Sequence, residues 1–199
     1  MTRGEVGRDR EANTENNHGD RDNEEEEEIK IIIVEGMDGS GKTTLVNYLA
    51  YRLKVQVEKS PGPVGIEEYW AWIDSTIRRE RAGEKWIYDR HAFFSDQVYS
   101  ILRKERNHQV RSPVAVSQMR ALINCNPTVI YCRPFEEAIL DGLLDKDHME
   151  GVPENWVDLL RRYDELMTEM KQYFNVVYYN WEVTPIDFLV EKVQLTRIR

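Results

Sequence analysis

The chain has 199 residues, 41% of them hydrophobic and 32% charged, so its length favours one domain with a sizeable core and room for a tail. Its net charge of -9 argues against a basic nucleic-acid-binding face spread over the whole protein. No apolar run is long enough to span a membrane, the first residues lack the apolar stretch of a secretory signal, and the two cysteines form no CxxC pair. We therefore expect a cytoplasmic protein without a disulfide framework or a zinc site.

The first 28 residues differ from the rest of the chain in charge and in apolar content. They contain four arginines and eleven acidic residues, and therefore hold seven of the nine net negative charges. They contain no aromatic residue, and after Met1 their only aliphatic side chain larger than alanine is Val6. Because such a segment cannot bury enough surface to offset the entropy of ordering, we expect a disordered acidic tail at residues 1–28 and a folded domain at residues 29–199. The acidic run at residues 24–28 could be an interaction arm or a DNA mimic, but a solvated tail is favoured because nothing else marks the run.

Removal of residues 1–28 is therefore expected to leave folding and activity almost unchanged. The segment has almost no apolar side chains to contribute to a core. Thermal unfolding of the full-length and truncated proteins should give Tm values within about 2 °C of each other. A loss of several degrees, or of most activity, would contradict the disordered-tail interpretation.

From residue 29 onward, short apolar runs alternate with helical stretches, which is typical of an α/β protein with a parallel sheet. Residues 30–34 form a nearly continuous β-branched run and predict a strand buried on both faces. Residues 42–53 place leucines four residues apart and predict a helix. Further strands are expected at residues 55–58, 86–88, 128–132 and 176–179. Further helices are expected at residues 66–81, 93–102, 114–123, 135–144 and 154–173, with a last one that has Thr184 as its N-cap and begins at Pro185.

Residues 36–43, with the sequence Gly-Met-Asp-Gly-Ser-Gly-Lys-Thr, fit the pattern G-x-x-x-x-G-K-[ST] between the first predicted strand and the first predicted helix. Glycines let successive N–H groups turn toward phosphate oxygens, and the helix amino terminus adds partial positive charge. Lys42 would reach the β- and γ-phosphates, and the Thr43 hydroxyl would bind Mg²⁺. We therefore expect ATP or another nucleoside triphosphate, together with Mg²⁺. The residues expected to bind it are Gly36, Met37, Asp38, Gly39, Ser40, Gly41, Lys42, Thr43 and Thr44.

A second candidate site is Asp89 with its neighbour Arg90, after the third predicted strand. A phosphate-binding loop also serves switches, motors and transporters, so it does not define the reaction by itself. Ligands of α/β proteins bind at the carboxyl ends of central strands, where Asp89 could hold Mg²⁺. The planar guanidinium of Arg90 is suited to a phosphate, and a structural salt bridge between Asp89 and Arg90 is the alternative.

Four segments resemble, in the same order, the thymidylate kinase group of nucleoside monophosphate kinases. Residues 34–44 resemble that group's P-loop, E-G-x-D-G-x-G-K-[ST]-T, and residues 89–91 resemble its D-R-Y motif. Residues 59–62 resemble its R-E-P-G turn, and residues 126–138 the strand and helix before its lid. The resemblance spans roughly residues 30–195 and implies a three-layer α/β P-loop NTPase fold, with a parallel sheet of about five strands flanked by helices. Residues 147–152 also resemble the lid of phage-encoded relatives.

The resemblance implies a transferase of nucleotide biosynthesis that uses Mg-ATP to phosphorylate a deoxynucleoside monophosphate, with a pyrimidine base, to the diphosphate. It implies that Asp38 lies at the acceptor side, that Asp89 orders Mg²⁺ and its waters, and that Arg90 clamps the acceptor phosphate. Lys59 stands where the family's turn has arginine and would be a second phosphate contact, although an ammonium is a point charge rather than a fork. Members of the family are commonly homodimers, which makes a homodimer a hypothesis from resemblance alone.

The family places a catalytic arginine in the P-loop or in the lid, and this sequence has none in its P-loop or in the expected lid at residues 145–153. A transferring phosphoryl group needs positive charge beyond Mg²⁺. The nearest arginines are Arg133 before the lid and Arg161 and Arg162 after it. We expect Arg161 or Arg162 to supply the charge, with Lys146 as the next candidate. The alternative for both arginines is a solvated helix face.

The pocket for the acceptor base is the least defined part of the predicted site. Tyr69 and Phe94 lie in segments expected near the acceptor, where an aromatic ring could stack on a base. His91 stands where the family has tyrosine, and could donate to a base or a phosphate; Ser60 stands where it has glutamate. The alternatives are that the aromatic residues belong to the core and that His91 caps the helix that follows it.

Two other functions remain open from the sequence. One is a kinase that acts on a hydroxyl group, either of a nucleoside or of a hydroxymethylated base in DNA, and only this reading includes a nucleic-acid partner. The nearly balanced charge of residues 29–199 argues mildly against it, because DNA binding favours a basic groove. The other is a nucleotide-dependent regulatory ATPase without an acceptor.

Overall fold

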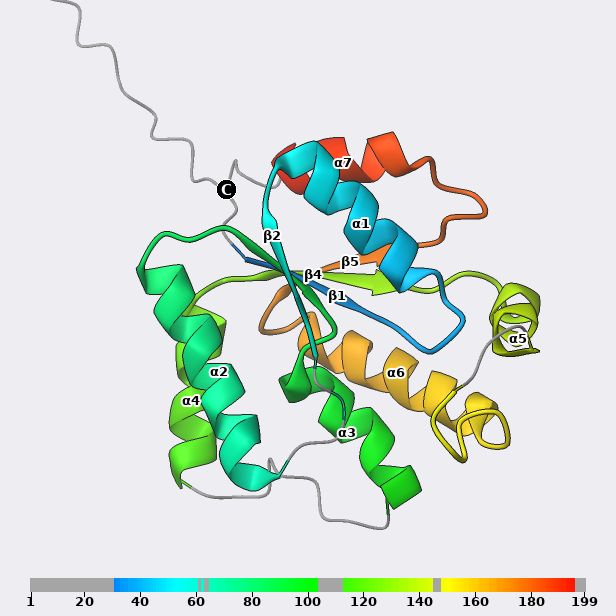
Figure 1. Ribbon diagram of the computed structural model, residues 1–199, viewed down its shortest axis with the longest axis horizontal. Coiled ribbons are helices and arrows are strands. Elements are labelled where there is room, and N and C mark those ends of the chain that lie inside the picture. Colours follow the sequence, from blue (N-terminus) through cyan, green and yellow to red (C-terminus); the bar gives the residue numbers. More distant parts are fainter. Residues whose placement is uncertain (1–30, 61, 63–64, 104–112, 145–147, 196–199) are drawn as a thin grey trace, which may run out of the picture.

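The computed structural model describes residues 31–60, 62, 65–103, 113–144 and 148–195 (Figure 1). The expected tail at residues 1–28, and Lys146, lie outside the described residues. The strands are β1 (Ile31–Glu35), β2 (Gln56–Lys59), β3 (Trp86–Asp89), β4 (Thr128–Cys132) and β5 (Asn175–Tyr179). They form one sheet in the order β2-β3-β1-β4-β5, in which every neighbouring pair is parallel.

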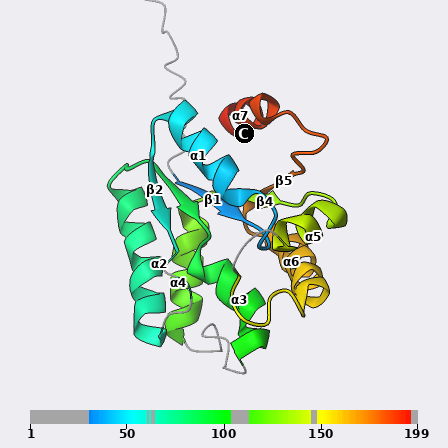
Figure 2. The same cartoon turned by 45° about the vertical axis from the view of Figure 1, so that its right-hand side comes forward.

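Helices lie on both faces of this sheet. They are α1 (Lys42–Leu53), α2 (Ile66–Arg81), α3 (Ala92–Arg103), α4 (Pro113–Asn124), α5 (Glu136–Leu144), α6 (Trp156–Met170) and α7 (Ile186–Leu195). Helices α1 and α7 cover one face, whereas α2, α3, α4 and α6 cover the other (Figure 1, Figure 2). The three-layer α/β architecture predicted from the sequence is therefore confirmed. None of the described helices is long and apolar enough to cross a membrane.

The boundaries of the elements agree with the sequence-based prediction within one residue, apart from the helix predicted at residues 154–173. Helix α6 begins at Trp156 and ends at Met170, three residues before the predicted end. At this end the N–H groups of Gln172 and Tyr173 donate to carbonyls three residues back, Glu169 and Met170, at 3.1 and 3.0 Å, so the α-helix gives way to tighter turns. Helix α7 begins at Ile186, one residue after the predicted start.

Strand β1 is buried on both faces, as its β-branched run predicts. Ile31 and Ile33 pack into the larger hydrophobic core, which includes residues of α2, α3 and α6. Ile32 and Val34 pack into the smaller core, with residues of α1 and α7. Because alternate side chains of a strand point to opposite faces of the sheet, β1 contributes two isoleucines to one core and Ile32 with Val34 to the other.

The strand order places three loops at one edge of the sheet. β1 lies between β3 and β4, and the chain turns to opposite sides of β1 on its way to these two neighbours. Such a switch of direction leaves a crevice at the carboxyl ends of the strands, where ligands of open α/β sheets bind. The loop at residues 36–41 follows β1, Arg90 follows β3 and Arg133 follows β4, so the predicted site residues meet at this edge.

Candidate active site

The loop at residues 36–41, here called the P-loop, joins β1 to the first turn of α1. Within it the Ser40 N–H donates to the Met37 carbonyl at 3.2 Å. In the part of the chain that the structure describes, no hydrogen bond uses the N–H groups of Gly41, Lys42 and Thr43, and the buried Ser40 Oγ has no partner either. Unpaired N–H groups at a helix amino terminus, beside an unsatisfied buried hydroxyl, fit the phosphate groups of a nucleotide.

Lys42 is held inside the P-loop. Its Nζ donates to the Met37 carbonyl, and the residue is only 6% exposed. Burial, followed by the positive charge of Arg90, lowers the pKa of Lys42 to about 8, although the nearby carboxylates of Asp38 and Asp89 oppose the shift. Because an anion stabilises a desolvated ammonium, a phosphate next to Lys42 would restore its full positive charge.

Two residues predicted to hold Mg²⁺ lie side by side. The Thr43 hydroxyl of α1 donates to Oδ2 of Asp89, the last residue of β3, at 3.3 Å. Mg²⁺ in phosphate-transferring sites is usually bound by one or two protein oxygens, with phosphates and water completing its octahedron. The oxygen pair of Thr43 and Asp89 fits that requirement, so these two residues could hold the ion.

Arg90 connects β3 to the P-loop. Its guanidinium forms an ion pair with Asp38 of the P-loop, rather than with Asp89 as the sequence-based alternative had it, and lies over the Tyr99 ring at 5.0 Å from the centroid. Burial alone would raise the pKa of Asp38, but the positive charges of Arg90 and Lys42 outweigh it and lower that pKa. The only hydrogen bond of the guanidinium to a described residue uses one terminal nitrogen. The other guanidinium nitrogens form no hydrogen bond with a residue that the structure describes.

Glu35 is a buried site residue that the sequence analysis did not identify. It is the last residue of β1 and is fully buried. Its carboxylate accepts hydrogen bonds from the His91 N–H at 2.6 Å and from the Tyr163 hydroxyl at 3.2 Å. Burial raises its pKa to about 7, against the lowering effects of the His91 N–H and Arg90. An acidic residue directly after a buried β-branched run is the sequence signal that could have identified it.

The acceptor-side residues predicted from the sequence fall into two groups. Lys59 ends β2 opposite Asp89 in the register, and the Ser60 N–H donates to the Asp89 carbonyl at 3.1 Å, so this turn does reach the site edge. By contrast, Tyr69 and Phe94 are 0% exposed within the larger core. Both side chains therefore belong to the core, which was the alternative to a stacking role, and we leave both out of the acceptor site.

His91 is also fully buried and occupies the capping position weighed as its alternative. Its Nδ1 accepts a hydrogen bond from the Phe93 N–H at 3.2 Å, at the start of α3, and its Nε2 lies 3.0 Å from the Thr76 hydroxyl. Burial lowers the pKa of His91 to about 3. A neutral ring with both nitrogens engaged does not fit a contact with an acceptor phosphate, so we leave His91 out of the acceptor site as well.

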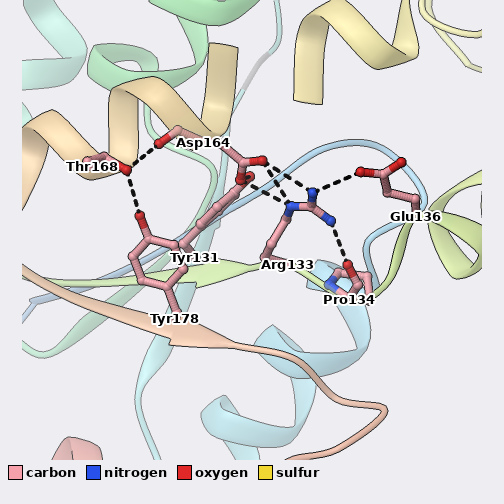
Figure 3. Close-up of polar contacts among 7 residues, drawn as sticks. All are labelled: Tyr131, Arg133, Pro134, Glu136, Asp164, Thr168 and Tyr178. Atoms are coloured by element: carbon pink, nitrogen blue, oxygen red, sulfur yellow. Dashed lines mark hydrogen bonds and ion pairs between the residues drawn. The ribbon is translucent and has the colours of Figure 1, made fainter. Parts of the chain in front are cut away.

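The arginines considered near the lid have partners or positions outside the P-loop. Arg133 donates to both carboxylate oxygens of Asp164 on α6, at 3.1 to 3.2 Å, and also to Glu136 (Figure 3). Arg161 and Arg162 lie on the exposed side of α6, where Arg161 pairs with Asp158 at 2.7 Å. None of the three forms a hydrogen bond or ion pair with a described P-loop residue.

Helix α5 packs directly on the P-loop. Gly39 has a φ of +79°, and a Cβ on Gly142 of α5 would lie 2.7 Å from its Cα. A ring nitrogen of His148 lies 3.2 Å from the Gly142 carbonyl, and the charge of His148 also lowers the pKa of Asp38. Helix α5, which directly precedes the predicted lid, therefore packs against the loop expected to bind phosphate.

Gly142→Ala is expected to displace α5 or the P-loop, because the added methyl group meets backbone atoms that cannot move aside. The free energy of unfolding should fall by about 1–3 kcal/mol, and ATP binding should weaken. Urea unfolding and calorimetric titration measure the two effects. Gly65→Ala is the matched control, since a Cβ there lies 3.7 Å from its nearest neighbour and φ is -68°. Equal stability and equal ATP affinity for the two variants would contradict this packing.

The fold is shared with solved kinase structures, although no family model and no curated protein matches the sequence. One similar structure is the YorR protein of Bacillus subtilis in complex with phosphorylated GDP, at a TM-score of 0.57 and 17% identity, covering 84% of this chain and 95% of that one. A deoxyadenosine kinase from M. mycoides with bound dATP has a TM-score of 0.57 and 17% identity, over 82% and 98% of the two chains. A thymidylate kinase from Candida albicans has a TM-score of 0.54 and 14% identity, over 85% and 92%. At these identities the likeness shows a shared three-layer α/β fold.

Proposed function

We propose that the protein is a Mg-ATP-dependent kinase that phosphorylates a nucleoside monophosphate, with a pyrimidine deoxynucleoside monophosphate such as dTMP as the first candidate. One observation favours this most. The loop that fits phosphate, an oxygen pair suited to Mg²⁺ and the Arg90 guanidinium, which among the described residues hydrogen-bonds only Asp38, meet at one sheet edge. A donor phosphate and an acceptor phosphate would each have their own cation there.

The residues on the donor side bind and orient the triphosphate. The N–H groups of Gly41, Lys42 and Thr43, which no described residue accepts from, would hold phosphate oxygens. The Lys42 ammonium would stay paired with the transferred phosphoryl group. When bound by Thr43 and Asp89, Mg²⁺ supplies charge neutralisation of the phosphates. Phosphoryl transfer needs little covalent chemistry, so this alignment is the main contribution of the protein.

The residues on the acceptor side orient the incoming phosphate. Arg90 is anchored by Asp38, which fixes its fork near the P-loop, and Lys59 lies across from Asp89 on the neighbouring strand. We keep Arg161 and Arg162 as proposed lid cations, because both are exposed and the Arg161–Asp158 pair is an exposed ion pair that is easily exchanged.

Glu35 favours a second candidate, a kinase with a hydroxyl acceptor. A hydroxyl group must lose its proton during transfer, whereas a monophosphate oxygen is already deprotonated. The pKa of Glu35 is about 7, which suits a proton acceptor at neutral pH, and the positive charge of Arg90 acts on the same carboxylate. The carboxylate is fully buried and already accepts hydrogen bonds, so the monophosphate remains our first candidate.

An ATP-to-ADP assay with a panel of acceptors tests these proposals. The panel contains nucleosides, nucleoside monophosphates and hydroxymethyl-containing DNA, and chromatography identifies the phosphorylated product. We expect turnover with a nucleoside monophosphate and loss of turnover when EDTA removes Mg²⁺. Turnover with nucleosides or DNA alone would favour the hydroxyl kinase, and hydrolysis that no acceptor changes would favour a regulatory ATPase.

A further inference from the structure

Trp181 touches the P-loop from a distant part of the chain. It lies in the turn between β5 and α7, and its indole N–H donates to the Ser40 carbonyl at 3.1 Å. The ring also covers Gly41, since a Cβ on that glycine would lie 3.0 Å from the indole nitrogen. Trp181 is 45% exposed, so burial in a core does not explain its position.

The turn that holds Trp181 is fixed on both sides. The Asn180 carbonyl accepts from the Thr184 N–H at 2.8 Å, and the Asn180 side chain accepts from the Glu182 N–H at 2.9 Å. The Glu182 carboxylate in turn accepts from the Phe135 N–H, in the segment after β4. These hydrogen bonds therefore fix the turn that places the indole against the P-loop.

Peptide geometry gives this contact a consequence for phosphate binding. In a trans peptide, the Ser40 carbonyl and the Gly41 N–H lie in one plane and point in opposite directions. Fixing the carbonyl toward Trp181 therefore directs the Gly41 N–H away from Trp181. Gly39 and Gly41 flank Ser40, with φ of +79° and +84°, and glycine-rich backbone of this kind reorients readily unless something holds it.

We propose that Trp181 is a positioning residue of the P-loop, whose indole N–H holds the Ser40–Gly41 peptide so that the Gly41 N–H remains directed at a donor phosphate. This inference rests on the proposed function, because it requires that the P-loop binds a polyphosphate. Trp181 then contributes to polyphosphate affinity through the backbone of the loop, without contact between its ring and the nucleotide base.

The test compares Trp181→Phe with the wild-type protein by calorimetric titration of Mg-ATP and of tripolyphosphate, which has no base. The variant keeps an aromatic ring but loses the N–H donor. We expect the Kd of both ligands to rise by a similar factor of about five to ten, because one hydrogen bond no longer orders the loop. The KM for ATP should rise likewise, with kcat and the Tm nearly unchanged.

Trp86→Phe is the matched control. The Trp86 indole also donates a single hydrogen bond, to Glu84 at 2.8 Å, but at the amino end of β3, away from the P-loop. Its affinity for both ligands should equal that of the wild type. Unchanged affinities in Trp181→Phe would overturn the inference and leave the proposed function intact. Weaker binding of Mg-ATP alone would also overturn it, since the ring would then act on the base. A wild-type protein that binds neither ligand would overturn both the inference and the proposed function.

Discussion

Replacing Arg90 with alanine is expected to lower kcat/KM for the acceptor by about a hundredfold or more, while ATP binding is largely kept. Arg90 is a forked cation at this edge of the sheet, and its ion pair with Asp38 fixes it beside the P-loop. Loss of a charge-assisted paired contact removes several kcal/mol from acceptor binding and alignment. The donor side keeps Lys42, Thr43 and the N–H group of Gly41, for which the described residues offer no acceptor. Acceptor kinetics and ATP titration on the same variant measure the two effects.

Arg90→Lys separates charge from geometry. Residue 90 has a φ of +67°, and arginine and lysine experience the same backbone strain there, so the two proteins differ mainly in the fork. Lysine should restore only part of the activity, because an ammonium cannot form the paired contact. Arg52→Ala is the control, since Arg52 forms an exposed ion pair with Asp187 at the far end of α1. Normal acceptor kinetics in Arg90→Ala would show that Arg90 only forms an ion pair with Asp38 and does not bind the acceptor, and would favour a hydroxyl acceptor.

The parts of the fold that the sequence predicts well are those encoded by local patterns. The β-branched run of β1 and the leucine spacing of α1 depend on neighbours within a few residues, and both elements lie where the patterns place them. The P-loop pattern and the acid at the end of β3 are equally local. Parallel pairing in register then brings Val34 opposite Asp89, which explains why the Thr43–Asp89 pair follows from two separate motifs.

The parts that the sequence does not predict depend on contacts between distant residues. Arg90 pairs with Asp38, 52 positions away, although its neighbour Asp89 is the obvious local partner. Trp181 meets Ser40 across 141 positions, and no spacing rule connects a turn after β5 to the P-loop. The aromatic Tyr69 and Phe94 have the composition of a stacking site and also of a core, and only their burial distinguishes the two.

The buried carboxylate of Glu35 shows how tertiary structure changes the chemistry of a motif residue. In the sequence it is one letter of the P-loop pattern, whereas in the fold it joins β1, the start of α3 and the Tyr163 hydroxyl of α6. Desolvation by these layers places its pKa near 7. The sequence leaves open whether the acceptor is a phosphate or a hydroxyl group. In the structure, Glu35 is the residue on which this question depends, because only a hydroxyl acceptor needs a group that takes up its proton.

Lys42→Ala is expected to reduce phosphoryl transfer by about a thousandfold or more without unfolding the protein, because the Lys42 charge acts on the transferred phosphate. The variant should still fold, because the charge of buried Lys42 does not stabilise the folded state. Burial lowers the pKa of Lys42 from 10.5 to about 8, so the unfolded chain holds this proton more tightly than the folded one. The charged Lys42 side chain therefore lowers the free energy of unfolding at pH 7. This free energy rises between about pH 8 and 10.5, where the folded protein has lost the Lys42 proton and the unfolded chain still holds it.

Removing the side chain should accordingly leave the free energy of unfolding at pH 7 equal or higher, and should abolish the gain in stability of the wild type between pH 8 and 10.5. Urea unfolding across this pH range and a single-turnover assay at pH 7 measure the two effects. Lys171→Ala is the control, because that ammonium lies over the Tyr178 ring at 3.9 Å on the exposed end of α6. Near-normal turnover in Lys42→Ala would refute the P-loop assignment, since the Lys42 ammonium, which donates to the Met37 carbonyl, is the charge expected to act on the transferred phosphate.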